Sequence, residues 1–278
     1  LSVGYGLEDE AKHQNVDLLL FEAGGYRARD TQIAQLEACV QRGAQAILIG
    51  AVTSDHTDLI DAVAKVAERV PVYGLVNELH AQALRGRIGV DWSDMGSALG
   101  LYLSQLHPAG SAPKTAVLLT GPAEAGWTGP LETGLRDAMA ASAVTISQTF
   151  GADTGLRPQL ALVELALQRY PDMDYLIGSA PAVEAAIGVL SAQPGGPKPV
   201  LLATYASYTI KRGLMNGSVL AASFDDPMVQ ARMAIRQAAL RVPPSAQTVG
   251  PEIVVLTHAD ANLSDVSTPP ADYFPAIQ

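Results

Sequence analysis

The chain has 278 residues, of which 48% are hydrophobic, and its formal net charge at pH 7 is −10. Because the chain is acidic and has no run of four or more Lys or Arg, we do not expect it to bind nucleic acid or an anionic membrane directly. No apolar stretch approaches the roughly 20 residues that a membrane-spanning helix needs. The single cysteine, Cys39, excludes an intrachain disulfide and a cysteine-based metal site.

The first part of the chain alternates segments of helical periodicity with short apolar runs. The helical segments are residues 1–14, 29–42, 55–69 and 94–106. The predicted strands are residues 17–22, 45–49, 70–75 and 86–90. The first element is thus a helix, whereas a βα series begins with a strand. We therefore expect that a native strand preceding Leu1 is absent from this sequence.

The second part continues the same alternation. Strands are predicted at residues 114–120, 144–149, 175–177, 200–203 and 219–223. Helices are predicted at residues 127–141, 156–169, 182–190, 209–216 and 226–240. Residues 260–278 are polar and proline-rich, which indicates coil that wraps the surface.

Repeated βα units imply right-handed crossovers and parallel sheets, and a single open sheet of so many strands would be unusual. We therefore predict an α/β fold of two doubly wound, parallel-sheet lobes joined by a multi-strand hinge. The strongest break in the first half is the segment HPAGSAP at residues 107–113. One lobe is assigned residues 1–112 and 225–256, and the other residues 113–224 and 257–278.

The sequence offers little that is typical of an enzyme. The five histidines are isolated and have no metal-binding spacing, and no GxSxG elbow or P-loop is present. Gly24-Gly25 follows a predicted strand but lacks the GxGxxG spacing of a dinucleotide site. We therefore expect no catalytic residues, no metal and no cofactor, and an enzyme is the least favoured class.

The aromatic residues are more informative, because they make up only 5% of the chain. Tyr26, Trp92, Trp127 and Tyr205 each lie next to a turn or at the end of a predicted strand. Ligands of open α/β sheets bind beyond the carboxyl ends of the strands, and pockets are rich in aromatic side chains. Each ring alone could simply pack under a loop, but together the four favour a shared aromatic cleft.

Three segments then carry a resemblance to a known family. They are TGPAEAGWTGPLETGLRDAM (120–139), YPDMDYLIGSAPAVEAAIGVL (170–190) and YASYTIKRGLMNGSVLAASFDDPMVQARMAI (205–235). Over nearly its whole length the chain resembles the type I periplasmic binding proteins. Within them it is most similar to the TorT-type periplasmic sensors of trimethylamine N-oxide.

The resemblance implies a periplasmic, non-enzymatic protein that closes its lobes on a small ligand and partners the sensor domain of a membrane histidine kinase. The pocket of that family uses Trp and Tyr side chains, which carries over to Tyr26 and Trp92 and less directly to Trp127 and Tyr205. Asp91 and Asp226 lie at lobe-crossing positions where sugar-binding relatives keep polar contacts. Asp226 precedes Pro227, so it also suits the N-cap of a helix.

The chemistry of trimethylamine N-oxide suits an aromatic cleft. Aromatic faces attract its methylated, positively polarised nitrogen by about 0.5–2 kcal/mol each, and Trp N–H or Tyr O–H groups can donate to its oxygen. Two alternatives share the fold: a sugar-binding protein of an ABC transporter, with a more polar cleft, and the effector-binding core of a LacI-type regulator. The residues alone leave these open.

Overall fold

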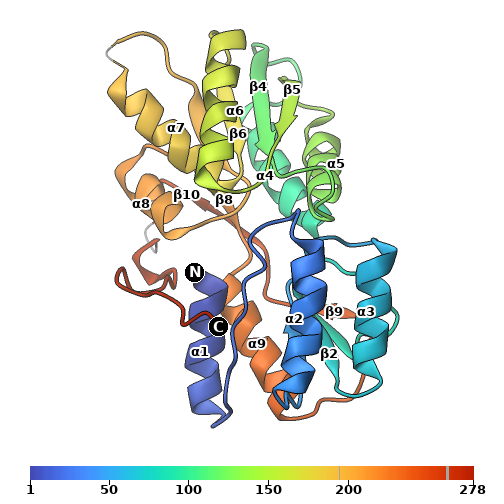
Figure 1. Ribbon diagram of the computed structural model, residues 1–278. Coiled ribbons are helices and arrows are strands. Elements are labelled where there is room, and N and C mark those ends of the chain that lie inside the picture. The colour runs from blue at the N-terminus through green and yellow to red at the C-terminus, as the bar shows by residue number, and fades with distance from the viewer. Residues whose placement is uncertain (194, 261–262) are drawn as a thin grey trace.

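A computed structural model describes residues 1–278 except 194 and 261–262, and it contains two sheets of mainly parallel strands (Figure 1). The smaller sheet has the order β1-β2-β3-β9 and all its pairs are parallel. Its strands are β1 (Ile47–Ile49), β2 (Val72–Val76), β3 (Gly86–Gly89) and β9 (Thr248–Val249). Most β2 side chains are buried, as expected for a strand covered on both faces.

Helices cover both faces of this four-stranded sheet. One face carries α2 (Arg29–Gln41) and α3 (Thr57–Ala67), and the other carries α1 (Ser2–His13) and α9 (Pro227–Ala239). The α1–α9 contact is close, because a Cβ on Gly6 would lie 2.6 Å from the Met228 carbonyl oxygen. It is also polar at one end, where Arg236 donates two hydrogen bonds to the buried Glu10 carboxylate.

The larger sheet has the order β10-β8-β7-β6-β4-β5, and only β10 runs antiparallel to its neighbour. Its strands are β4 (Lys114–Thr120), β5 (Val144–Gly151), β6 (Tyr175–Gly178), β7 (Val200–Ala203), β8 (Ala221–Phe224) and β10 (Val254–Thr257). Ala116 through Leu119 of β4 are fully buried, as expected for an apolar strand that pairs on both sides and is covered on both faces.

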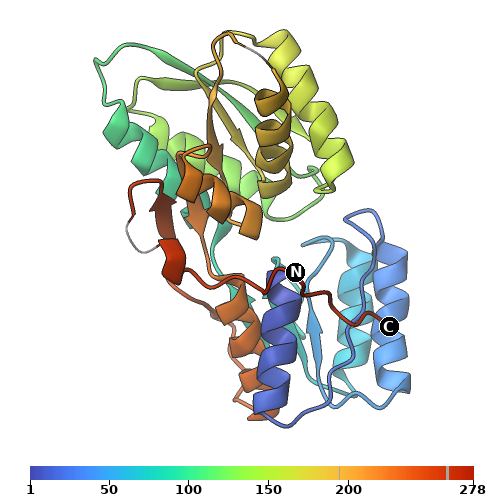
Figure 2. The same cartoon turned by 90° about the vertical axis from the view of Figure 1, so that its left-hand side faces the viewer.

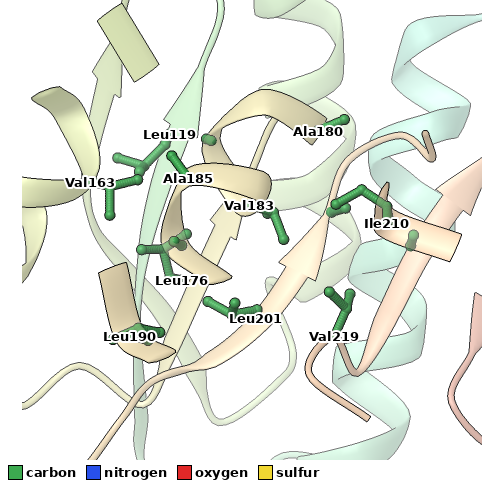
Figure 3. Packing of buried hydrophobic residues seen from close by; sticks show 14 of the residues in the cluster. Leu119, Val163, Leu176, Ala180, Val183, Ala185, Leu190, Leu201, Ile210 and Val219 are labelled. Atoms are coloured by element: carbon green, nitrogen blue, oxygen red, sulfur yellow. The ribbon is translucent and has the colours of Figure 1, made fainter. Parts of the chain in front are cut away.

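Helices also cover both faces of the six-stranded sheet. They are α4 (Trp92–Leu106), α5 (Thr128–Met139), α6 (Leu156–Arg169), α7 (Ala180–Ala192) and α8 (Tyr208–Asn216). Val163 of α6, Val183 of α7 and Ile210 of α8 pack in the core of one face (Figure 3). Leu99 of α4 and Leu135 of α5 pack in the core of the other. None of the helices in the described residues is long and apolar enough to cross a bilayer.

The chain crosses between the lobes at β3–α4, β8–α9 and β9–β10. These crossings gather on one side of the molecule (Figure 2). The C-terminal segment also passes from one lobe to the other: Lys211 of α8 donates to the Val266 carbonyl, and the Tyr273 hydroxyl donates to Glu8 of α1. The prediction of two doubly wound lobes in an α/β fold is confirmed.

The structure differs from the prediction in one expected strand and in the division of the chain between the lobes. Residues 17–22 do not form a strand of either sheet, because their backbone makes only one isolated bridge, between Leu20 and Ile277. The helix α4, which the sequence division placed in the first lobe, packs on α5 and β8 of the second, so the crossing comes before Trp92 rather than at residue 112. In the same way, β10 pairs in the second lobe and the end of the tail lies against the first.

Candidate aromatic ligand site between the lobes

The four aromatic residues singled out in the sequence converge in one cluster between the lobes. Trp127 lies at the centre, with its ring centroid 5.2 Å from Trp92, 6.0 Å from Tyr205 and 6.5 Å from Tyr26. Trp92 and Tyr205 meet edge to face at 6.4 Å. Both tryptophans are almost fully buried, together with Val90, Met95, Ala125 and Leu131. We call these residues and their aromatic neighbours the aromatic cluster.

Packing of α4 on α5 sets the positions of the two tryptophans. Ser97 donates to the Gly134 carbonyl and Ser104 to the Ala138 carbonyl, so the contacts advance together along both helices and the pair is parallel. Trp92 is the first residue of α4 and Trp127 immediately precedes α5. Because the two helices start at the same end of the pair, the two indole rings lie side by side.

Glycines allow this helix pair to approach backbone to backbone. A Cβ on Gly96 would lie 2.0 Å from the Leu131 carbonyl oxygen, and one on Gly134 would lie 2.0 Å from the Ser93 carbonyl oxygen. No side chain fits at such distances, so only glycine permits this spacing. The tryptophans are therefore attached to a closely packed part of the six-stranded lobe.

Tyr26 comes from the other lobe, on the loop that precedes α2. Two glycines with positive φ, Gly24 at +100° and Gly25 at +123°, turn the backbone just before it. The indole Nε1 of Trp127 donates to the Tyr26 hydroxyl at 2.8 Å, which makes a hydrogen bond across the lobes. Burial raises the pKa of both Tyr26 and Tyr205, so both phenols stay protonated at neutral pH.

Two residues at the end of β2, its last residue Val76 and the following Asn77, also face the cluster, and neither was predicted from the sequence. The amide of Asn77 donates to the Tyr26 hydroxyl at 3.5 Å and to the Ala51 carbonyl at 2.9 Å. The Val76 carbonyl accepts from Trp92 Nε1 at 3.4 Å. Val76 has φ of +63°, a strained value for a β-branched residue, and such strain clusters at ligand sites. A polar residue directly after an apolar strand is the signal that could have pointed to Asn77.

Two more contacts join the lobes beside the rings. A Cβ on Gly126 would lie 2.4 Å from Ser54 Cβ, and one on Gly25 would lie 2.8 Å from the Asp153 carboxylate. Ser54 donates to Asp55, which also bonds His80 Nδ1 at 2.5 Å. That hydrogen bond with Asp55 raises the pKa of His80. The lobes thus meet in a closed arrangement.

The two predicted aspartates lie outside the cluster of rings. Asp91 caps α4, because its Oδ1 accepts from the Ser93 amide at 2.8 Å and from the Ser93 hydroxyl at 2.7 Å. Asp226 caps α9 by accepting from the Val229 amide at 3.0 Å. Asp226 therefore makes the contacts expected of a helix N-cap, as the Asp226-Pro227 sequence suggested, and Asp91 makes the same kind of contact.

A neighbouring carboxyl that the sequence analysis passed over is more deeply placed. Asp225 is 5% exposed and accepts a hydrogen bond of 2.6 Å from Gln230 Nε2. Burial raises the pKa of Asp225. Within the described part of the chain, no three His, Cys, Asp or Glu side chains converge so as to hold a metal ion. The arrangement of the rings suits binding of a small, partly apolar molecule.

Comparison with known proteins gives a consistent result. A family model described as a periplasmic binding protein domain matches residues 2–242. The chain is 36% identical over 264 residues to the periplasmic protein TorT of Escherichia coli (strain K12), covering 94% of this chain and 75% of TorT.

The solved structures that match the whole chain include the following two. The complex of TorT with the TorS sensor domain in the presence of trimethylamine N-oxide has a TM-score of 0.86 and 35% identity, covering 100% of this chain and 94% of that one. An ABC transporter solute-binding protein from Bradyrhizobium sp. BTAi1 with bound bis-tris has a TM-score of 0.82 and 34% identity, covering 100% of this chain and 84% of that one.

Proposed function

The chain belongs to the family of periplasmic binding protein domains, and from that premise we propose that it is a sensor of trimethylamine N-oxide or a closely similar amine. In this proposal, ligand binding closes the two lobes, and the closed form signals to the sensor domain of a membrane histidine kinase. The protein is periplasmic, as its family and its TorT relatives are. Those relatives are binding proteins, and we propose that this chain likewise has no enzymatic activity.

One observation carries the proposal: three buried or half-buried rings from one lobe meet a fourth ring from the other. The ring centroids of Trp92, Trp127 and Tyr205 lie 5.2–6.4 Å from one another, and the face of an aromatic ring attracts methyl groups on a positively polarised nitrogen. The ligand oxygen needs a donor, and the indole N–H of Trp127 and the amide of Asn77 both point at the Tyr26 hydroxyl. We propose that the Tyr26 hydroxyl, which accepts from both groups, donates its own proton to the amine oxide oxygen.

Lobe closure follows from where the donors and acceptors lie. The bond from Trp127 to Tyr26 joins the lobes, as does the bond from Trp92 to the Val76 carbonyl. A ligand held between these groups would contact both lobes only when the lobes are closed. It would therefore bind the closed form better than the open form and shift the population toward it.

Calorimetric titration tests this directly. We expect trimethylamine N-oxide to release heat and ribose to release none, and Trp92→Ala to weaken binding by at least tenfold. Tyr208→Phe, a change on an exposed ring of α8, serves as the control and should bind normally. Heat from the sugar alone would contradict the proposal of an amine sensor. Unchanged affinity in Trp92→Ala would show that this ring is not part of the ligand site.

The similarity to the Bradyrhizobium sp. protein favours a second candidate, a solute-binding protein that delivers a small amine to an ABC transporter. A deletion strain separates the two candidates: loss of ligand-induced kinase output supports the sensor, and loss of ligand uptake supports the transporter. A sugar-binding role remains a weaker proposal, because the rings give the cluster an apolar lining. A LacI-type regulator core does not fit a periplasmic protein.

A further inference from the structure

Residues 263–278 connect the two lobes a further time, in addition to the crossings at β3–α4, β8–α9 and β9–β10. We call this segment the tail strap. It leaves the larger lobe beside α8 and passes in front of α1 on the face turned to the viewer in Figure 2. The three crossings join the lobes by continuous backbone, whereas the tail strap is joined to the smaller lobe only by noncovalent contacts. These contacts can therefore form and break as the lobes move.

The larger lobe holds the first part of the tail strap. Leu263 is 4% exposed and belongs to the core that α6, α7 and α8 share. Lys211 of α8 donates from Nζ to the Ser264 carbonyl at 3.1 Å and to the Val266 carbonyl at 2.6 Å. Hydrogen bonds from a charged donor are stronger than those between neutral groups. A buried side chain and two such bonds therefore fix this end of the tail strap to α8.

The smaller lobe holds the last part of the tail strap through fewer buried contacts. The Tyr273 hydroxyl donates to Glu8 Oε1 of α1 at 3.0 Å, and the Ala276 amide donates to the same oxygen at 3.3 Å. The Tyr273 ring meets the Tyr5 ring edge to face at 5.1 Å. Burial and the hydrogen bond with Glu8 raise the pKa of Tyr273, so its phenol stays a donor at neutral pH. The neighbouring Phe274 is 81% exposed, so this end is held without a core of its own.

The stretch between the two attachments is short and stiff. Seven residue steps separate Val266 from Tyr273, and an extended chain of that length spans at most about 25 Å. Pro269 and Pro270 each have a fixed φ, and Pro269 is buried. The Tyr273 amide donates to the Pro270 carbonyl at 3.1 Å, and this turn shortens the stretch further. The tail strap therefore has little slack with which to follow a rotation of α8 relative to α1.

We propose that the tail strap stabilises the closed lobes, and that its Tyr273 end detaches from α1 when the lobes open. Contacts that exist in only one arrangement of the lobes shift the population toward that arrangement. The end at Tyr273 detaches first, because the end at Lys211 has a buried leucine beside it. Ligand binding and attachment of the tail strap strengthen each other, since both require closed lobes. The inference rests on the lobe closure of the proposed function but not on the identity of the ligand.

The test compares full-length variants that release either end of the tail strap. Tyr273→Ala removes the contacts with Glu8 and Tyr5, and Lys211→Met removes the two hydrogen bonds but keeps an apolar stem. Without ligand, X-ray scattering should show a larger radius of gyration for each variant than for the wild type. Affinity for trimethylamine N-oxide should fall about threefold to tenfold in calorimetry, as expected for loss of contacts of this kind. Phe274→Ala, a change of the neighbouring exposed ring, is the matched control and should alter neither measurement.

A double variant distinguishes a strap from two local packing effects. A strap acts only while both of its ends are held, so Tyr273→Ala combined with Lys211→Met should open the lobes no further than either change alone. Additive effects would show that each residue stabilises only its own lobe, and would overturn the proposal. Circular dichroism verifies that each variant folds. Tyr273→Phe, which loses only the hydrogen bond to Glu8, should give a smaller shift in the same direction and replaces Tyr273→Ala if that variant unfolds.

The remaining outcomes separate this inference from the proposed function. An unchanged radius of gyration in both single variants would overturn the strap even if trimethylamine N-oxide binds the wild type. Equal effects of Tyr273→Ala and Phe274→Ala would overturn it as well. If the wild type does not bind trimethylamine N-oxide, the proposed function fails, and the scattering comparison without ligand still decides whether the tail strap favours closed lobes.

Discussion

The aromatic cluster has two halves that differ in the backbone beneath them. Trp92 and Trp127 stand at the starts of two parallel helices that glycines hold in backbone contact. Tyr26 stands on a loop whose two preceding glycines have positive φ, and it reaches the other rings only across the lobe boundary. The core of the larger lobe holds the two tryptophans in place. Tyr26 joins them only when the lobes are closed.

The difference assigns separate tasks to the two halves. A preorganised surface pays no ordering entropy on binding, so the tryptophan pair is suited to recognise the ligand. A ring delivered by closure contributes only in the closed state, so Tyr26 is suited to couple recognition to lobe movement. Substitutions in the two halves should therefore affect stability and ligand affinity differently.

Trp127→Ala should have the largest effect, because it removes a large ring that is 2% exposed from the centre of the cluster. Loss of a buried tryptophan costs about 3–5 kcal/mol, and we expect the free energy of unfolding to fall by that amount in urea denaturation. Ligand binding should be lost in the same variant. A loss of binding with no loss of stability would mean that the tryptophan half is not part of the lobe core.

Gly134→Ala tests whether helix packing holds the tryptophans. The new Cβ would lie 2.0 Å from the Ser93 carbonyl oxygen, and such overpacking costs about 1–3 kcal/mol. We expect lower stability and a shifted emission of the two tryptophans. Gly129→Ala on the same helix is the control, since nothing lies within 4 Å of its Cβ, and it should stabilise the helix by about 1 kcal/mol. Equal effects of the two changes would contradict the model of a glycine-held pair.

The convergence of the four rings could be predicted from the sequence because aromatic residues are scarce and each of the four follows a strand or a turn. The parallel α4–α5 pair could not, since helical periodicity marks an apolar face without naming its partner. For the same reason residues 17–22 were wrongly predicted as a strand: an apolar run does not reveal whether another strand lies beside it. The placement of α4 in the second lobe depends on the same tertiary information.

Tyr26→Phe should have a smaller effect that is confined to closure. It removes the acceptor of the Trp127 indole N–H and leaves the ring in place. A hydrogen bond of this kind contributes about 0.5–1.5 kcal/mol, so we expect ligand affinity to fall about threefold to tenfold with unfolding unchanged. X-ray scattering should show a larger radius of gyration for the variant at equal ligand saturation. Tyr208→Phe, which makes no such bond, should match the wild type in both measurements.

The smallest expected effect is a pH dependence of stability in the smaller lobe, which also carries Tyr26. The hydrogen bond with Asp55 raises the pKa of His80 above the ordinary value of about 6.5. The stabilisation it gives is fully present below about pH 6.5 and is lost as the pH rises through the raised value. Because His80 is exposed, we expect less than about 1 kcal/mol.

Thermal melts of wild type and His80→Gln between pH 6 and 9 measure that contribution. The wild type should lose slightly more stability with rising pH than the variant does, and the difference should shrink in high salt. Parallel pH profiles would show that the Asp55–His80 pair contributes nothing to the loop that carries Ser54.

Asn77 and Val76 show what the sequence could not supply. Neither residue could be assigned a role from the sequence, because polar residues after strands are common and most of them cap or turn. Their importance lies in a strained φ at Val76 and a hydrogen bond from Asn77 to a residue 51 positions away. Both are properties of the folded chain, whereas the scarcity of tryptophan is a property of the composition.

The division of the chain between the lobes has a consequence for how the protein folds. Residues 92–224 are one continuous stretch that supplies five of the six strands of the larger sheet. The smaller lobe instead needs α9. The hydrogen bond between Arg236 and Glu10 cannot form until Arg236 has been synthesised. Contacts so distant in sequence form late because of the entropy of closing a long loop. We expect the larger lobe to form first during secretion and the smaller lobe to finish only after the last third of the chain has emerged.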